Sequence, residues 1–251
     1  MDKTMIPEKV SSTFNIPCYM FDLRAQLRPA AFMDLAQEIA AEGVEVLHFA
    51  DHDLKQFGMV WIIARMQVRF LRYPKRLDSA TIETWHRGQE GLFFIRDYRL
   101  LDTKGEVMVE STSSWILMDT AHRSIVRPDR LPDDIRKEAQ CHDQATDGTA
   151  GKIILPKTIK VEDAGERICQ YSDLDYNGHV NNARYVVWTL DAIPQDWTLH
   201  RDVREFSINF NKEVRPGEHV LLQCAQDGDS WYVEGRDSDG IQNFICKVEF
   251  D

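Results

Sequence analysis

The sequence predicts an α+β protein built from two copies of one unit, a long helix followed by an antiparallel sheet. Three observations predict this fold class. Apolar residues recur at helical spacing in two segments, apolar and polar residues alternate in several others, and the later segments repeat the earlier ones at nearly constant offsets. Helices and antiparallel strands in separate runs along the chain are typical of the α+β class.

The first predicted helix occupies residues 29–47. Apolar side chains recur there at helical spacing, and Pro29 suits the first turn, where its missing N–H is no loss. Strands follow the helix, because apolar and polar residues alternate in four runs bounded by turn residues. These runs are residues 60–70, 80–86, 92–101 and 107–118. Together they predict an antiparallel sheet.

The second copy repeats this plan. Residues 181–193 have a helical pattern that Pro194 ends. Residues 205–211 then alternate as in a strand, with the aromatic and aliphatic side chains expected to point inward. A helix followed by a strand therefore recurs in the second half of the chain.

The offsets between the copies are nearly constant. Strand residues match at an offset of 140 positions, as from Val68 to Ile208, and helix residues at an offset of 153, as from Phe32 to Tyr185. The first copy therefore has 13 more residues between its helix and its strand. We place this insertion at residues 50–59.

The repeat predicts two domains joined by a linker. Residues 129–157 are rich in Pro, Asp, Gly and Thr, a composition typical of linkers and surface loops. We therefore expect a domain at residues 1–128 and another at residues 158–251. The alternative is a long loop inside a single domain.

Composition limits the classes of function. The chain has 251 residues, 43% apolar and 28% charged, as in globular proteins, and its net charge of −11 argues against nucleic-acid binding. No apolar stretch approaches the roughly 20 residues that span a bilayer, and no signal peptide begins the chain, so we expect no membrane span and a cytoplasmic location. The five cysteines include no CxxC pair, so no disulfide framework or zinc site is indicated.

The two copies differ most at a few polar positions. A helix wrapped by a sheet needs only apolar matching, so polar residues present in one copy alone require another explanation. The second copy has an imidazole and a carboxylate that the first copy lacks. Its polar residues are Asp175, Asn177, His179 and Glu213, which stand opposite Asp22, Arg24, Gln26 and Tyr73.

This polar set resembles the parts of a hydrolase. The first three residues alternate, so their side chains project together from an extended segment. A helix start follows at Asn181 or Asn182, and its free amides suit a carbonyl oxygen that becomes an oxyanion. Histidine is a common general base, and Glu213 could deprotonate or orient a water molecule.

Each residue also has an ordinary explanation. Asp175 and Asn177 could be turn and cap residues, His179 a surface or core histidine, and Glu213 a solvated charge. A calcium loop is not supported, because its glycine and its final glutamate are missing, so we expect no metal. The chain has no GxSxG, no GxGxxG after a strand and no Walker sequence, so we also expect no cofactor.

Residues 173–188, DLDYNGHVNNARYVVW, resemble the acyl-acyl-carrier-protein thioesterases of plants and bacteria. Members of that family carry an Asp-x-Asn-x-His-Val-Asn-Asn run followed by Tyr and Trp. The resemblance extends over nearly the whole chain, with matches in order at FMDLAQEIAAEG (32–43), RYP (72–74), ETW (83–85) and SWILMD (114–119). It implies a tandem (double) HotDog fold, in which curved sheets enclose the two long helices and join back to back.

The resemblance also implies the roles of the site residues. Asp175, Asn177 and His179 match the family's catalytic run, and Glu213 matches an acidic residue on a later strand. Plant members often have cysteine at the next position, where this chain has Val214. We therefore expect water, not cysteine, as the nucleophile. Glu213 and His179 would deprotonate the water, Asn177 would bind water or thioester, and Asp175 would orient its neighbours.

Two further sets of residues complete the expected site. The backbone amides of Val180, Asn181 and Asn182 are expected to bind the oxyanion. The acyl chain is expected in an apolar pocket of the first copy, because that copy lacks the polar set. The candidates for its wall, each equally readable as core, are Met33, Ala36, Ala40, Trp61, Ile63 and Met66.

The partner implied by the resemblance is acyl carrier protein with its phosphopantetheine-linked acyl chain. The carrier is acidic and so is this chain, so docking would need a focused basic patch. The densest basic cluster is Arg65, Arg69, Arg72, Lys75 and Arg76, with Arg201 and Arg204 as competitors. The alternative is that these residues form the solvated face of a strand.

The function expected from the sequence is hydrolysis of fatty acyl-acyl carrier protein in fatty acid biosynthesis. An acyl-CoA thioesterase would use the same site with another thiol carrier. A non-catalytic acyl-binding HotDog protein and a HotDog dehydratase are alternatives from other classes. Chain-length preference stays open, as does the choice between monomer and homodimer.

Overall fold

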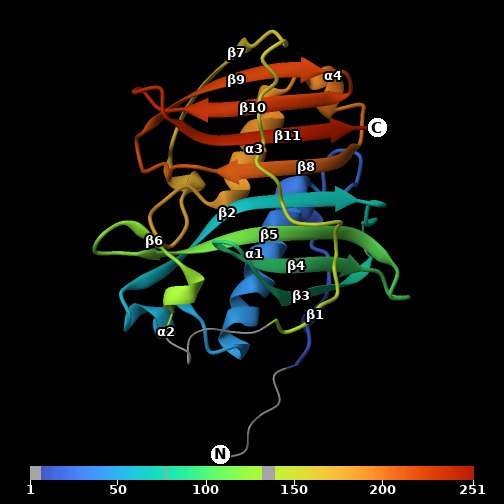
Figure 1. Cartoon of the computed structure of the whole chain (residues 1–251). Helices are drawn as coiled ribbons and strands as arrows, with labels where there is room; N and C mark the ends of the chain where they lie inside the picture. Colours follow the sequence, from blue (N-terminus) through green and yellow to red (C-terminus); the bar gives the residue numbers. More distant parts are fainter. Residues whose placement is uncertain (1–6, 77, 132–138) are drawn as a thin grey trace, which may run out of the picture.

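The computed structural model describes residues 7–76, 78–131 and 139–251. Within them an antiparallel sheet of 11 strands has the order β1-β3-β4-β5-β2-β8-β11-β10-β9-β7, with β6 paired to β5 (Figure 1). The strands are β1 (Val10–Asn15), β2 (Met59–Phe70), β3 (Ser79–Glu90), β4 (Phe93–Leu101), β5 (Val107–Asp119), β6 (Ser124–Val126), β7 (Glu162–Ile168), β8 (Val203–Phe210), β9 (His219–Asp227), β10 (Ser230–Arg236) and β11 (Gln242–Phe250).

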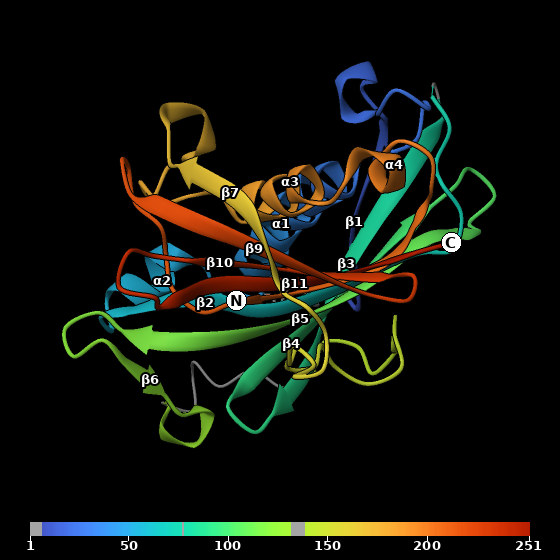
Figure 2. The ribbon, with the colours of Figure 1, turned by 90° about the horizontal axis from the view of Figure 1, so that it is seen from above.

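The long helices α1 and α3 lie side by side on one side of this sheet (Figure 2). The helices are α1 (Pro29–Val46), α2 (Asp51–Lys55), α3 (Asn182–Ala192) and α4 (Gln195–Thr198), and the 3-10 turns are η1 (Cys18–Met20), η2 (Pro128–Arg130) and η3 (Tyr171–Asp173). α1 starts with proline in its first turn, whereas α3 is capped by the Asn181 side chain. Among the described residues, no helix is long and apolar enough to cross a membrane.

The predicted duplication is present, and the α+β tandem HotDog expectation is confirmed. α1 and α3 begin 153 positions apart, and β3 and β9 begin 140 positions apart, as the sequence offsets require. The two copies meet where β2 pairs with β8, with Met66 opposite Ile208. The expectation that the sheets join back to back is wrong, because this backbone pairing joins them edge to edge in one sheet.

The extra residues of the first copy are spread over the helix, the strand and the segment between them. α1 has 18 residues and α3 has 11, so most of the excess lengthens the helix. β2 has 12 residues and β8 has 8, and a short helix follows the long one in both copies. Placing the whole insertion at residues 50–59 is therefore wrong. A longer α1 gives the first copy more surface for a cavity.

A β-bulge interrupts the expected alternation in β2. The register with β5 shifts between Ile63 and Arg65, so Ile63 and Met66 are both buried although they lie three positions apart. Ile62 and Ala64, expected to point inward, are only half-buried. The bulge turns Trp61 and Ile63 toward the helix side of the sheet.

The segment predicted as a linker packs on the other face of the sheet. Asn209, expected to point outward, is 4% exposed because it accepts the Ile153 N–H at 2.7 Å and donates to Gly151 O at 3.1 Å. Trp85 Nε1 donates to Asp143 O at 2.8 Å farther along. The described part of this segment therefore covers the sheet instead of hanging free (Figures 1 and 2).

Candidate active site

A tight turn before α3 holds the predicted polar residues. Asp175 Oδ1 accepts the backbone N–H groups of Asn177 at 2.8 Å and His179 at 3.3 Å, and the Asp175 N–H donates to His179 O at 2.9 Å. Gly178 closes the turn with φ +77°, a left-handed conformation that glycine adopts without strain. The backbone thus uses the Asp175 carboxylate, while the side chains of Asn177 and His179 remain available for a substrate.

His179 faces Glu213 across the site. His179 Nε2 lies 3.3 Å from Glu213 Oε2, and the other carboxylate oxygen accepts hydrogen bonds from Arg215 at 2.7 Å and Arg123 at 3.4 Å. Glu213 follows the end of β8 in the loop to β9, so the expectation of a strand position is wrong. Both carboxylate oxygens therefore have a partner, and one of them orients the imidazole.

The charge state of Glu213 suits this role. Burial raises its pKa, but the Arg215 hydrogen bond and the charges of His179, Arg215 and Arg123 outweigh burial, so the net pKa lies below the usual range. Glu213 is therefore ionised at neutral pH. An ionised carboxylate beside an imidazole favours proton uptake by that imidazole, which is what a general base requires.

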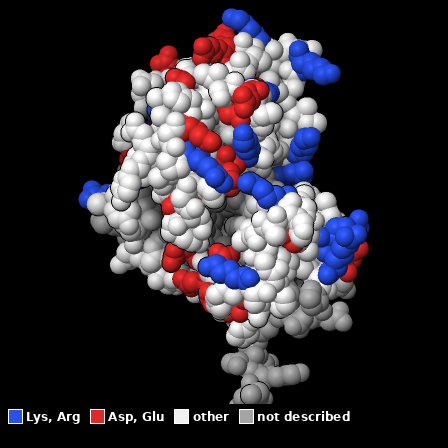
Figure 3. Space-filling view, turned by 90° about the vertical axis from the view of Figure 1, so that its left-hand side faces the viewer, with Lys and Arg blue, Asp and Glu red and all other residues white. Residues whose placement is uncertain are grey.

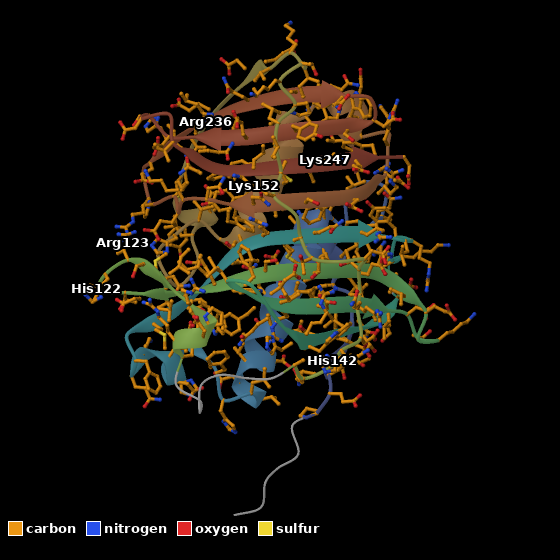
Figure 4. All side chains as sticks on the ribbon, viewed as in Figure 1. His122, Arg123, His142, Lys152, Arg236 and Lys247 are labelled. Atoms are coloured by element: carbon orange, nitrogen blue, oxygen red, sulfur yellow. The ribbon has the colours of Figure 1, made fainter. Side chains whose placement is uncertain are left out.

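A cavity of about 1070 Å³ opens at this pair. All four predicted residues line it, namely Asp175, Asn177, His179 and Glu213. The same face of the molecule is hollowed, with both basic and acidic side chains around the hollow (Figure 3). Arg123 projects at the same edge from the turn between β5 and β6, so the first copy reaches the acid of the second (Figure 4).

Two of the three amides expected in the oxyanion site are already used. The Val180 N–H donates to Val214 O at 2.9 Å, and the Asn181 N–H donates to Asp173 O at 2.8 Å. That expectation is wrong for both residues, because the chain pairs with neighbouring segments before the helix starts. Asn182 is the first residue of α3, and its N–H has no acceptor among the described residues. It is the backbone donor left for an oxyanion.

Three of the six residues predicted for the cavity wall line the cavity. Ala40, Trp61 and Ile63 line the cavity, whereas Met33, Ala36 and Met66 belong to the main apolar core and are at most 2% exposed. The sequence could not separate these sets, because all six lie on the inward side of α1 or β2. Aromatic residues that the sequence analysis missed complete the wall, namely Phe49, Phe94, Trp115, Tyr185 and Phe210.

Gln37 is a further residue of the site that the sequence did not indicate. Its side chain accepts from Asn182 Nδ2 at 2.9 Å and donates to Asn181 Oδ1 at 3.3 Å. These bonds join α1 of the first copy to the start of α3 in the second. A lone glutamine on a helix carries no sequence signal for such a contact, because it resembles any solvated residue.

The basic cluster predicted for the carrier protein lies away from the cavity. None of its five residues lines it: Arg65 directly follows Ala64, which does, and the other four lie farther along β2 and in the loop after it. Arg69 pairs with Glu110 at 3.2 Å and Arg72 with Asp102 at 2.7 Å, so carboxylates partly neutralise the cluster. The competitors Arg201 and Arg204 are paired with Asp229 and Glu249.

No cysteine is found among the described residues that line the cavity. Val214, at the position next to Glu213, is fully buried. Cys169, Cys224 and Cys246 are also buried, and burial raises the pKa of each thiol. These thiols are poor nucleophiles, since the thiolate is the reactive form.

Family sequence models match both copies. The acyl-ACP thioesterase N-terminal domain matches residues 7–139, and the acyl-ACP thioesterase C-terminal domain matches residues 157–244. Oleoyl-acyl carrier protein thioesterase 2 of Arabidopsis thaliana is 28% identical over 207 residues, which cover 74% of this chain and 54% of that protein. The oleoyl-acyl carrier protein thioesterase of Coriandrum sativum is 25% identical over 223 residues, which cover 82% and 60%. The chain thus spans less than two thirds of these relatives.

Solved structures share the fold at low identity. An acyl-ACP thioesterase from Bacteroides thetaiotaomicron has a TM-score of 0.82 at 20% identity, covering 97% of this chain and 98% of that one. The 12:0-ACP thioesterase from Umbellularia californica has a TM-score of 0.80 at 20% identity, covering 98% of both chains. The arrangement of two fused copies is therefore shared along the whole length.

Proposed function

This chain belongs to the acyl-ACP thioesterase family, and from that premise we propose that it hydrolyses fatty acyl-acyl carrier protein to free fatty acid and carrier protein. The observation that carries the proposal is the pair of His179 and Glu213, 3.3 Å apart and facing a cavity with apolar walls. A base at the mouth of an apolar cavity suits a substrate with a long chain and a reactive carbonyl at one end.

The reaction would be direct hydrolysis by water. Glu213 stays ionised and orients His179, which takes a proton from the water as its oxygen attacks the thioester carbon. The Asn182 N–H and the Asn177 amide, which line the cavity, would bind the oxyanion or the water. When the carbon–sulfur bond breaks, the thiolate of the carrier's arm takes the proton back from the imidazolium. Asp175 holds the turn that carries these groups.

The two copies would divide the work. Residues 158–251 supply the reacting groups, and residues 1–128 supply most of the cavity wall, through α1, β2, β4 and β5. The first copy has no imidazole or carboxylate at the positions opposite His179 and Glu213, so its interior can hold an acyl chain. The linker at residues 129–157 would fix the copies on one sheet.

The direct test is release of free fatty acid from acyl carrier protein thioesters of graded chain length. We expect turnover on carrier protein thioesters to exceed turnover on the matching acyl-CoA thioesters. Faster turnover of acyl-CoA would favour the acyl-CoA thioesterase alternative. Binding of an acyl thioester without release of thiol would favour a non-catalytic acyl-binding protein, and hydration of an enoyl thioester would favour a dehydratase.

The carrier protein would dock at the cavity mouth and not on the basic cluster predicted from the sequence. Lys55 and Arg123 are exposed and line the mouth. We expect Lys55→Glu to raise KM for acyl carrier protein while leaving KM for a small acyl thioester unchanged. Lys75→Glu is the matched control, and it should change neither. A raised KM in Lys75→Glu with an unchanged KM in Lys55→Glu would instead favour docking on the cluster predicted from the sequence.

The cellular location stays a prediction. The sequence favours the cytoplasm, whereas the plant relatives are named as chloroplastic. Fractionation of cells that express the natural gene would test the location, with the chain expected beside the cytoplasmic enzymes.

A further inference from the structure

The inner part of the cavity holds a charged residue that the hydrolytic scheme does not use. Arg96 lies on β4, lines the cavity and is 6% exposed. It faces the first copy's helix, beneath Gly43 of α1. A hydrocarbon chain needs no cation in its binding site, so this residue requires a separate explanation.

The charge of Arg96 has no carboxylate partner. Its one side-chain hydrogen bond among the described residues runs from Nη1 to Thr84 Oγ1 at 3.3 Å, and no ion pair includes it there. Nearby Arg87, by contrast, pairs with Asp97 at 3.1 Å. Burial lowers the pKa of Arg96. A guanidinium has five N–H donors, and leaving it buried without an anion is costly.

The fold is shaped around this guanidinium. A Cβ at Gly43 would lie 2.4 Å from Arg96 Nη1, so any other residue there would displace the guanidinium. Glycine in a helix interior is less favourable than alanine, so its presence in α1 needs a compensating reason. The last turn of α1 also brings the negative end of the helix dipole near the cation, which offsets part of its burial.

The distance from the reacting groups to Arg96 can be read along α1. Gln37 bonds Asn182 at the start of α3, and Gly43 lies six residues farther on, which is about 9 Å along the helix axis. A carbon–carbon bond of ~1.5 Å advances an extended chain by roughly 1.25 Å, so this span matches about seven bonds. A group about seven bonds from the thioester carbon would thus reach Arg96.

Resting on the proposed function, we propose that Arg96 recognises an oxygen group at the far end of the acyl chain, with Thr84 positioning the guanidinium. The substrate class would be acyl thioesters that carry a carboxylate about seven bonds from the thioester carbon. The guanidinium supplies the donors that a carboxylate accepts in a bidentate fashion. The Thr84 hydroxyl donates to Asp97 O at 2.9 Å and accepts from Arg96 at 3.3 Å, so it holds the guanidinium in place. An unsubstituted chain of the same length would leave the cation without an anion.

The test compares two thioesters on the same carrier protein, octanoyl and octanedioyl, which differ only at the far end. We expect the native chain to favour octanedioyl by at least about tenfold in kcat/KM, the scale of hydrogen bonds to a charged group. Arg96→Met should abolish this preference, because it removes the cation. Thr84→Val should weaken the preference less, because the guanidinium remains.

Equal kcat/KM for the two thioesters, or a preference that survives Arg96→Met, would overturn the assignment. The comparison on the native chain needs no variant, so misfolding of Arg96→Met would leave the proposal decidable. Failure of the proposed function has a different signature. In that case neither thioester would release thiol, and His179→Ala would change nothing.

Discussion

The turn at residues 175–179 and its counterpart at residues 22–26 have the same backbone and different side chains. Asp22 Oδ1 accepts the N–H groups two and four residues later at 2.8 and 2.9 Å, as Asp175 Oδ1 does at 2.8 and 3.3 Å. Each turn is closed by a backbone bond from the aspartate, at 2.8 Å in the first copy and 2.9 Å in the second. The aspartate therefore builds the turn in both copies.

The polar side chains at the matching positions of the two copies make different contacts. In the first copy, Gln26 donates to Asp202 at 3.1 Å, and Tyr73 donates to Val203 O at 2.7 Å, so its polar groups are bound within the protein. In the second copy, His179 and Glu213 face each other and the cavity. The turn is therefore common to both copies, and the difference in chemistry comes from the side chains that it carries.

The largest expected difference between the copies is in turnover. His179→Ala should lower kcat by about 10² or more, the usual scale for losing a positioned base. Gln26→Ala, at the matching position, should change kcat by roughly twofold or less, because Gln26 contacts Asp202 and does not line the cavity. Both are measured as free fatty acid released from one acyl carrier protein thioester. Equal losses of kcat in the two variants would contradict the assignment of the chemistry to the second copy.

The two aspartates should have similar effects on stability and different effects on rate. Asp175→Ala and Asp22→Ala each free two backbone N–H groups, so each should lower the free energy of unfolding by about 1–3 kcal/mol in urea titrations. Asp175→Ala alone should also lower kcat, because that turn carries His179. Asp175→Asn keeps the acceptor oxygen and should recover both. A stable Asp175→Asn with kcat as low as the alanine variant would give the carboxylate a chemical role.

A smaller difference is expected at the closing residue of each turn. Ala25 has φ +58° and Gly178 has φ +77°, so the first copy shows that alanine can occupy this turn. Gly178→Ala should therefore lower the free energy of unfolding by about 1 kcal/mol, with the turn intact and kcat nearly unchanged. Thermal unfolding and a rate assay measure the two effects. A large loss of kcat would show that the turns are not equivalent.

The smallest effect is expected in the pH dependence. The folded-state pKa of Glu213 is lowered, so its contribution to stability and rate is present above the unfolded pKa and is lost as pH falls through the folded pKa. Arg215→Met removes a hydrogen bond that lowers this pKa, so the acid limb of kcat/KM should move to higher pH. Arg204→Met, whose partner is the remote Glu249, should leave the limb in place. If the acid limb of kcat/KM stays at the same pH in Arg215→Met, Glu213 is not the group whose titration produces that limb.

Periodicity and repeat offsets were enough to predict two copies of a long helix followed by an antiparallel sheet. The 153 and 140 offsets mark the same helix and strand starts in both copies, because apolar matching preserves the length of packed elements. The edge-to-edge join of β2 to β8 and the bulge beside Ile63 could not be predicted. Both depend on which strands pair, and the alternation of side chains does not carry that information.

The candidate site was predictable as far as residue identity, and less so in its contacts. The difference between the copies indicated His179 and Glu213 correctly as residues of one cavity. It did not indicate that the amides of Val180 and Asn181 are already bonded, nor that Arg96 lies in the cavity without a carboxylate. Such features depend on partners brought together from distant parts of the chain.

In the proposed mechanism, Glu213 acts with His179 on water in the second copy. Glu213→Gln keeps the size of the side chain and removes its charge, and Tyr73→Phe is the matched variant in the first copy. In single-turnover assays with excess protein, we expect Glu213→Gln to release thiol at least about 10² more slowly while binding acyl carrier protein with native affinity. Tyr73→Phe should react at the native rate. Near-native thiol release by Glu213→Gln would show that the Glu213 carboxylate is not needed for the reaction.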